Sequence, residues 1–141
     1  MSDLKTRVQE MLRQPQLAGL ATITQDGKPW VRYVMVVASP DLTIRCATHS
    51  SAREVKQIAR SPEVHLTCGV TDPQQMAPYL QIQGRARLNT SRDARHGFWS
   101  EMLSGIFDGP DDPNYGVIEI EPYYIEYWAP GSREPEVWKA E

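Results

Sequence analysis

Short stretches of alternating apolar residues, separated by turn residues, most constrain what this chain can fold into. Residues 17–24 and 30–38 are rich in β-branched and other apolar side chains, and the Asp26–Gly27 pair between them is typical of a hairpin turn. Ser39–Asp41 makes a second turn before a third strand-like stretch, 42–48. Because strands joined by such short turns pair antiparallel, the first half predicts three strands of an antiparallel sheet.

The second half of the chain continues this pattern. Strands are predicted over residues 63–70 and 79–89, and a last pair over 116–122 and 123–128. Gly84, inside the second of these stretches, indicates a bulge or the close approach of another group. The sequence therefore predicts six or seven strands, most of them adjacent along the chain.

Three segments have the spacing of helices. The first lies within residues 1–15, with Ser2 as its cap and an apolar face. The second covers 52–60, and the third covers 91–107 with Ser91 as its cap. Since the strands outnumber the helices and follow one another closely, the pattern favours a mainly β fold, an antiparallel barrel with peripheral helices. 

Length and composition indicate the number of domains and argue against some classes of protein. A chain of 141 residues fits one domain, which we expect to span 1–141 and to end in a polar tail, 129–141. The net charge of −3 argues against a nucleic-acid partner, and no apolar run reaches the about 20 residues that span a bilayer. Cys46 and Cys68 lack metal or redox spacing, so we interpret them as buried thiols of a cytoplasmic protein. We assign no metal site.

Two features point to an anion site. Arg32 lies among apolar residues of a predicted strand, where a guanidinium needs an anion or carbonyl partners. Thr48, Ser51 and Arg53 lie at a strand-to-helix junction, where hydroxyls, free backbone N–H groups and a cation can bind a phosphate. The alternatives are that Arg32 is a surface residue of an edge strand and that Ser50 or Ser51 only caps the helix. The coincidence of the two features favours a ligand.

Three stretches of the sequence resemble those of a known family. RYVMVV (32–37), ATHSSAR (47–53) and IEYW (125–128) are similar in order and spacing to motifs of the pyridoxamine 5'-phosphate oxidase-like superfamily, in particular its general-stress-protein branch. The resemblance extends from about residue 17 to residue 128. It implies an FMN-binding split barrel, an antiparallel six-stranded β-barrel, and a homodimer with FMN at the subunit interface.

The resemblance also implies roles for individual residues. Arg32 would bind the FMN phosphate or the ribityl chain beside it, with Tyr33 and Val34 along the edge of the isoalloxazine ring. Thr48 would donate to the phosphate, and Arg53 would stand in for the family's phosphate-binding lysine.

Ser51 is a further phosphate candidate on the physical argument above. Tyr79 falls at the position of a flavin-contacting glutamine, and Trp128 would pack near the flavin of the second subunit. With the phosphate held in this way, we expect FMN to bind much better than riboflavin.

The sequence departs from the family's pattern at several positions. Val37 replaces a strand lysine, and Ala52 replaces an arginine beside the helix. Glu134 and Glu136 stand where the true oxidase carries an arginine and a histidine for the substrate's phosphate. Carboxylates there would repel a phosphorylated substrate, so the resemblance favours the flavin site and not pyridoxamine 5'-phosphate oxidase activity.

The expected function is that of an FMN-dependent oxidoreductase acting on an unidentified small molecule. The alternatives are a flavin-binding stress or sensing protein without turnover, and a deazaflavin-dependent reductase. No side chain is a convincing proton donor or nucleophile, so we name no catalytic residue, and the redox chemistry is expected to belong to the flavin.

Overall fold

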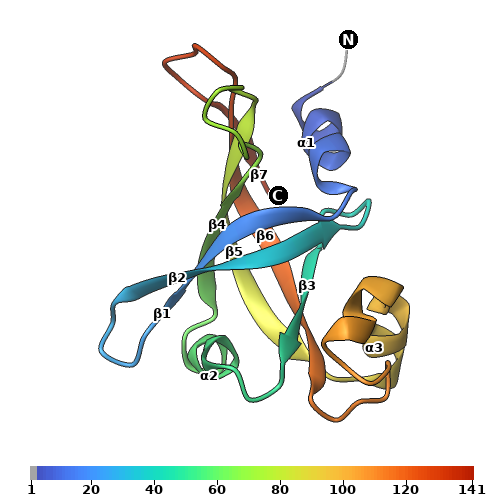
Figure 1. The fold of residues 1–141 in the computed structure, drawn as a ribbon. Coiled ribbons are helices and arrows are strands. Elements are labelled where there is room, and N and C mark those ends of the chain that lie inside the picture. The colour runs from blue at the N-terminus through green and yellow to red at the C-terminus, as the bar shows by residue number, and fades with distance from the viewer. Residues whose placement is uncertain (1–2) are drawn as a thin grey trace.

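The computed structural model describes residues 3–141, which form one antiparallel sheet and three α-helices (Figure 1). The strands are β1 (Gln16–Ile23), β2 (Pro29–Ala38), β3 (Ile44–His49), β4 (Glu63–Cys68), β5 (Tyr79–Asn89), β6 (Tyr115–Trp128) and β7 (Glu136–Lys139). The helices are α1 (Leu4–Leu12), α2 (Arg53–Arg60) and α3 (Arg92–Phe98), and a 3-10 helix, η1 (Glu101–Gly105), follows α3.

The sheet closes into a barrel because its first and sixth strands in spatial order also pair. The strand order is β3-β2-β1-β4-β5-β6-β7, and β3 pairs with β6 from Ile44 opposite Ile120 to His49 opposite Tyr115. Six strands therefore make the barrel, and β7 adds to β6 outside it. The predicted six-stranded antiparallel barrel with peripheral helices is confirmed.

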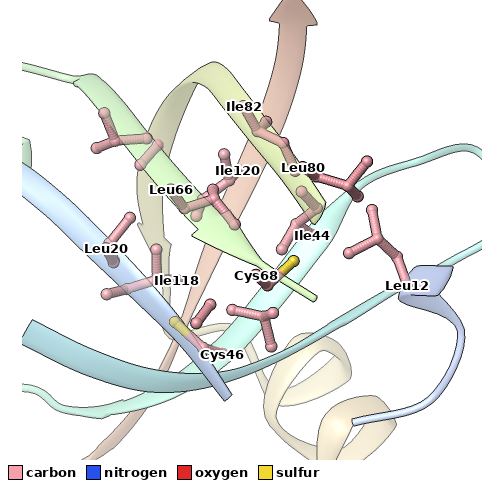
Figure 2. Packing of buried hydrophobic residues seen from close by; sticks show 14 of the residues in the cluster. Leu12, Leu20, Ile44, Cys46, Leu66, Cys68, Leu80, Ile82, Ile118 and Ile120 are labelled. Atoms are coloured by element: carbon pink, nitrogen blue, oxygen red, sulfur yellow. The ribbon is translucent and has the colours of Figure 1, made fainter. Parts of the chain in front are cut away.

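The core lies inside the barrel, where the alternating side chains of the strands meet. Figure 2 shows Leu20, Ile44, Leu66 and Ile118 pointing toward one another from β1, β3, β4 and β6, and all four are almost completely buried. Leu12 on α1 adds to this core from one end. In β1, β3, β4 and β5 every second residue is buried, which follows from the two-residue period of a strand.

Cys46 and Cys68 belong to the same core. Both are buried free thiols, as predicted. Burial raises the pKa of Cys46 to about 12 and that of Cys68 to about 11, because the thiolate cannot be hydrated there. Neither thiol is suited to act as a nucleophile.

The two last strands predicted from the sequence are one continuous strand. β6 runs from residue 115 to 128, and its pairing with β5 shifts at Gly84: Gln83 lies opposite Tyr124, but Gly84 lies opposite Pro122. Tyr123 is the extra residue, and this bulge accommodates a proline within the strand. A Cβ at Gly84 would lie 2.8 Å from Ile120 Cγ2, so the prediction of a bulge with a close approach is confirmed.

The predicted helices are shorter in the structure. Asp3 caps α1 by accepting from the Thr6 N–H at 2.8 Å, whereas the predicted cap, Ser2, lies outside the described residues. Ser91 caps α3 as predicted, but α3 ends at Phe98. The helix stops there because the backbone of Trp99 is not helical, with φ −58° and ψ 137°, and its ring packs edge-on against Tyr115, with 5.6 Å between the ring centroids.

The C-terminal segment, predicted to be only a polar tail, forms β7. It pairs with β6, and its Trp138 packs against the core. Arg7 on α1 holds this strand from the other side, because its guanidinium donates two hydrogen bonds of 2.7 and 2.8 Å to Glu136 and lies over the Tyr127 ring. β7 thus pairs with the outer edge of β6, although the polar composition of residues 129–141 did not indicate a strand.

Candidate functional site

Arg32 lies on β2 with its side chain turned toward the barrel end where α2 packs. The guanidinium donates to the carbonyls of Leu20 and Trp30 at 3.2 and 3.1 Å, to Thr22 Oγ1 at 2.7 Å and to Gln57 Oε1 at 3.2 Å. Its side chain is only 18% exposed, so the alternative of a surface arginine is wrong. Burial lowers the pKa of Arg32, and the charge of nearby Glu54 acts in the opposite direction.

The anion nearest to Arg32 belongs to the protein itself. Glu54, in the first turn of α2, places Oε1 3.9 Å from Arg32 Nε and Oε2 3.4 Å from Thr48 Oγ1. Thr48 is buried, and the Glu54 side chain is 19% exposed. Arg32 and Thr48 therefore face the same anion, and this anion is the Glu54 carboxylate, which was not among the residues expected at the site. The sequence feature that could have indicated Glu54 is its position directly after the candidate cation Arg53, in the first turn of the helix.

Arg53 begins α2 at the rim of the same site. Its side chain is exposed, and the guanidinium carbon lies 5.5 Å from the centroid of the Trp30 ring. The charge of Arg53 also contributes to lowering the pKa of Arg32. The two candidate cations thus lie near the start of α2, Arg32 mostly buried and Arg53 open to solvent.

The junction between β3 and α2 differs from a simple capped helix. The residue at the cap position is Ala52, whose side chain cannot accept a hydrogen bond. Ser50 Oγ instead donates to the Pro113 carbonyl, and Ser51 Oγ lies 2.8 Å from His49 Nδ1. The alternative that one of these serines only caps the helix is therefore wrong, and the first N–H groups of α2 have no side-chain cap.

An open cavity of about 710 Å³ lies on the outer face of β1, β2 and β4. Arg32, Tyr33 and Tyr79 line it together with apolar side chains that include Val31 and Met76. Three of the predicted site residues thus share one groove. Its mainly apolar lining beside a cation suits a flat aromatic ligand with a charged end.

Two other predicted residues lie next to this groove and not in it. Trp128 stacks on Tyr79 of the same chain, with ring centroids 6.1 Å apart and planes 6° apart, and its Nε1 donates to Gln81 and Glu126. Val34 turns toward the interior and packs against the core. The flavin contacts expected of both residues stay predictions.

A second cavity, of about 520 Å³, lies between the far end of β2 and α3, with Val37, Arg45 and Glu119 among its lining residues. Glu119 is buried, at 5% exposure, although a glutamate on a strand ordinarily faces solvent. Its carboxylate accepts from Arg45, Arg87 and Asn89. Three donors therefore balance the buried charge.

The tail carboxylates have different surroundings. Both are exposed, but Glu136 accepts two hydrogen bonds from Arg7, and its charge is therefore paired with a cation. The predicted repulsion of a substrate phosphate thus depends on Glu134 more than on Glu136. Within residues 3–141 no cluster of side chains suited to a metal ion is present, and no helix in that range is long and apolar enough to cross a membrane.

Comparison with known proteins gives a consistent result. A family model described as pyridoxamine 5'-phosphate oxidase matches residues 4–129. General stress protein 26 of Bacillus subtilis is 34% identical over 133 residues, which cover 94% of each chain. The crystal structure of General Stress Protein 26 from Bacillus anthracis has a TM-score of 0.83 at 24% identity, covering 97% of this chain and 98% of the other.

An F420 reductase shares the fold, with a TM-score of 0.63 at 21% identity over 83% of this chain and 94% of that one. With the family match over most of the chain, the relative of nearly equal length and the confirmed barrel, this chain belongs to the pyridoxamine 5'-phosphate oxidase family.

Proposed function

We propose that this chain binds FMN between two subunits of a homodimer and acts as a flavin-dependent oxidoreductase on a small molecule. The observation that carries the proposal is the apolar groove lined by Tyr33, Tyr79 and Arg32, together with the cations Arg32 and Arg53 near the start of α2. A planar apolar ring system fits the lining of this groove, and an anionic tail would extend from it toward the cations beside α2.

Different residues would bind the ring system and the phosphate of FMN. Tyr33 and Tyr79 would contact the ring system, and Arg53, Ser51 and the uncapped N–H groups of α2 would face the phosphate. A bound flavin would supply the redox chemistry, as an acceptor or donor of two electrons. The protein's own part is to orient the ring and to exclude water from it.

The dimer is proposed from the surface beside the groove. β1, β2 and the loop after β4 expose a set of large apolar side chains, an unusual feature for a surface that faces only water. These side chains are Leu17, Trp30, Val31, Tyr33, Met35, Val70 and Met76. A second copy of the chain would cover them and complete the groove, because an isologous contact places the same patch of each subunit against the other.

The first experiment identifies the cofactor. The purified protein should show a flavin absorbance spectrum, and the molecule released on denaturation should have the mass of FMN. The mass of a deazaflavin would instead assign the alternative cofactor. A protein that carries no flavin and does not quench added FMN would refute the proposal.

A pair of variants tests the phosphate end. Arg53→Ala should weaken FMN binding roughly tenfold or more, since a charge-assisted hydrogen bond is worth about 1.5–3 kcal/mol, and should leave riboflavin binding nearly unchanged. Arg60→Ala, at the other end of α2, serves as the control with the same change in charge. Equal loss of affinity for FMN in both variants would refute the placement of the phosphate.

A second pair tests the dimer by sedimentation equilibrium. Tyr33→Asp, on the exposed apolar face, should give a monomer with weakened FMN binding, because a carboxylate would be buried in the interface. Met102→Asp changes an equally prominent side chain on η1 and should leave the dimer intact. A monomeric wild-type protein that retains FMN would refute the shared site.

A further inference from the structure

Glu54 lies where a bound phosphate would have to meet Arg32 and Thr48. Its two carboxylate oxygens face these two groups at 3.9 and 3.4 Å. Both distances are longer than those of a tight ion pair or hydrogen bond, so the carboxylate is held loosely. Two of the four side chains predicted to bind a phosphate, Arg32 and Thr48, therefore already face an internal anion.

The terminal nitrogens of Arg32 do not depend on this carboxylate for hydrogen bonds. Its guanidinium already has four neutral acceptors, two of them backbone carbonyls and two of them side chains of β1 and α2. The four acceptors bind Nη1 and Nη2, so removing the charge of Glu54 would leave these two nitrogens with their partners. Nε faces Glu54 at 3.9 Å, which is too long for a hydrogen bond. Hydrogen bonding to Arg32 therefore does not explain the position of Glu54.

We propose that Glu54 sets the selectivity of the site for the charge on the flavin's tail. Its carboxylate competes with a phosphate for Arg32 and Thr48, and so it weakens the binding of phosphorylated flavins and not of riboflavin. This inference rests on the proposed flavin site.

Counting charges gives the direction of the effect. Arg32 and Arg53 bring two positive charges to this end of the barrel, and Glu54 removes one of them. A phosphate monoester carries close to two negative charges at neutral pH, whereas the ribityl end of riboflavin carries none. With Glu54 neutralised, the site should hold FMN more tightly, while riboflavin should show little difference.

The test compares Glu54→Gln with Glu10→Gln, which makes the same change in charge at an exposed position of α1. Both are titrated with FMN and with riboflavin at one ionic strength, and binding is followed by quenching of flavin fluorescence. Glu54→Gln should raise FMN affinity roughly tenfold or more and change riboflavin affinity less than about twofold, because only FMN carries the charge. The Glu10 variant should match wild type for both ligands. An unchanged or reduced FMN affinity in Glu54→Gln overturns the inference.

Inorganic phosphate separates this inference from the proposed function. Phosphate should raise the thermal unfolding temperature of Glu54→Gln more than that of wild type or Glu10→Gln, whether or not a flavin binds. If no variant binds a flavin but this gain is present, the flavin assignment fails and the role of Glu54 stands. If the gain is absent, the role of Glu54 is refuted. Glu54→Asp, which keeps the charge and shortens the side chain, provides a second folded variant and should give an FMN affinity between those of wild type and Glu54→Gln.

Discussion

Replacing Glu119 by alanine should lower the free energy of unfolding by about 3–5 kcal/mol, because it removes the acceptor of a buried ionic cluster. Glu119 is 5% exposed, and its carboxylate accepts from Arg45 Nε and Asn89 Nδ2, both at 2.9 Å, and from Arg87 Nη2 at 3.0 Å. Its alanine variant would leave these donors without their shared acceptor.

The size of the loss in the free energy of unfolding depends on whether each donor can be hydrated once Glu119 is removed. The Arg87 side chain is 68% exposed and can rehydrate, so its loss contributes about 1 kcal/mol or less. The Arg45 side chain is 30% exposed and Asn89 is half-buried, and hydrogen bonds to a charged group contribute about 1.5–3 kcal/mol each. Together they give about 3–7 kcal/mol, and the expected loss lies in the lower part of this range because Arg45 can partly rehydrate.

Urea denaturation of the variant and of Glu121→Ala provides the measurement. Glu121 lies two residues further along β6 and is exposed, so its replacement should change the free energy of unfolding by less than about 0.5 kcal/mol. A loss below about 1 kcal/mol for Glu119→Ala would mean that the cluster is not a significant source of stability.

The same carboxylate predicts a pH dependence. Burial by itself raises the pKa of Glu119, but the hydrogen bonds from Asn89 and Arg45 outweigh it, so the pKa lies below its ordinary value. Because the folded-state pKa is lowered, the contribution to stability is fully present above the unfolded-state pKa of about 4.3 and is lost as the pH falls through the folded-state pKa. Glu119→Gln should lack this part of the acid destabilisation.

Three further predictions concern the rest of the chain. Gly84→Ala should destabilise the protein by about 1–3 kcal/mol, since the new Cβ would lie 2.8 Å from Ile120 Cγ2, whereas Gly97→Ala in α3 meets no neighbour and should be neutral or slightly stabilising in the same thermal unfolding assay. Arg7→Ala should speed amide hydrogen exchange in β7, which loses its contact with α1; unchanged exchange would show that pairing with β6 suffices. The FMN-loaded protein should not oxidise pyridoxamine 5'-phosphate in a peroxide-coupled assay, because the exposed Glu134 replaces a phosphate-binding residue, and turnover at about 1 per second or faster would contradict this.

Much of the fold could be predicted because it depends on local patterns. The alternation that predicted a strand over 79–89 reflects the two faces of β5, and the observed strand has the same bounds. Gly84 indicated the bulge because only a residue without a side chain allows so close an approach. Ser91 capped its helix as predicted, since capping involves residues only three apart.

The candidate site was predicted only in part. The sequence pointed to Arg32, Thr48 and Arg53, because a guanidinium in an apolar strand and a hydroxyl-rich junction are local signals. That Arg32 and Thr48 face Glu54 depends on how α2 packs against β1 and β5, which the helix sequence does not specify. The cap at Ala52 likewise results from the serine hydroxyls finding partners in His49 and in a distant loop.

The surroundings of Glu119 are determined by the closure of the barrel. Glu119 and Arg45 are 74 positions apart and meet only because β3 pairs with β6. The alternation of β6 alone could not indicate that Glu119 would be buried and Glu121 exposed, since both side chains have the same place in the two-residue period. Whether a polar side chain on a strand faces water or three buried donors is determined by the strands and helices that pack over it, and those contacts exist only in the folded chain.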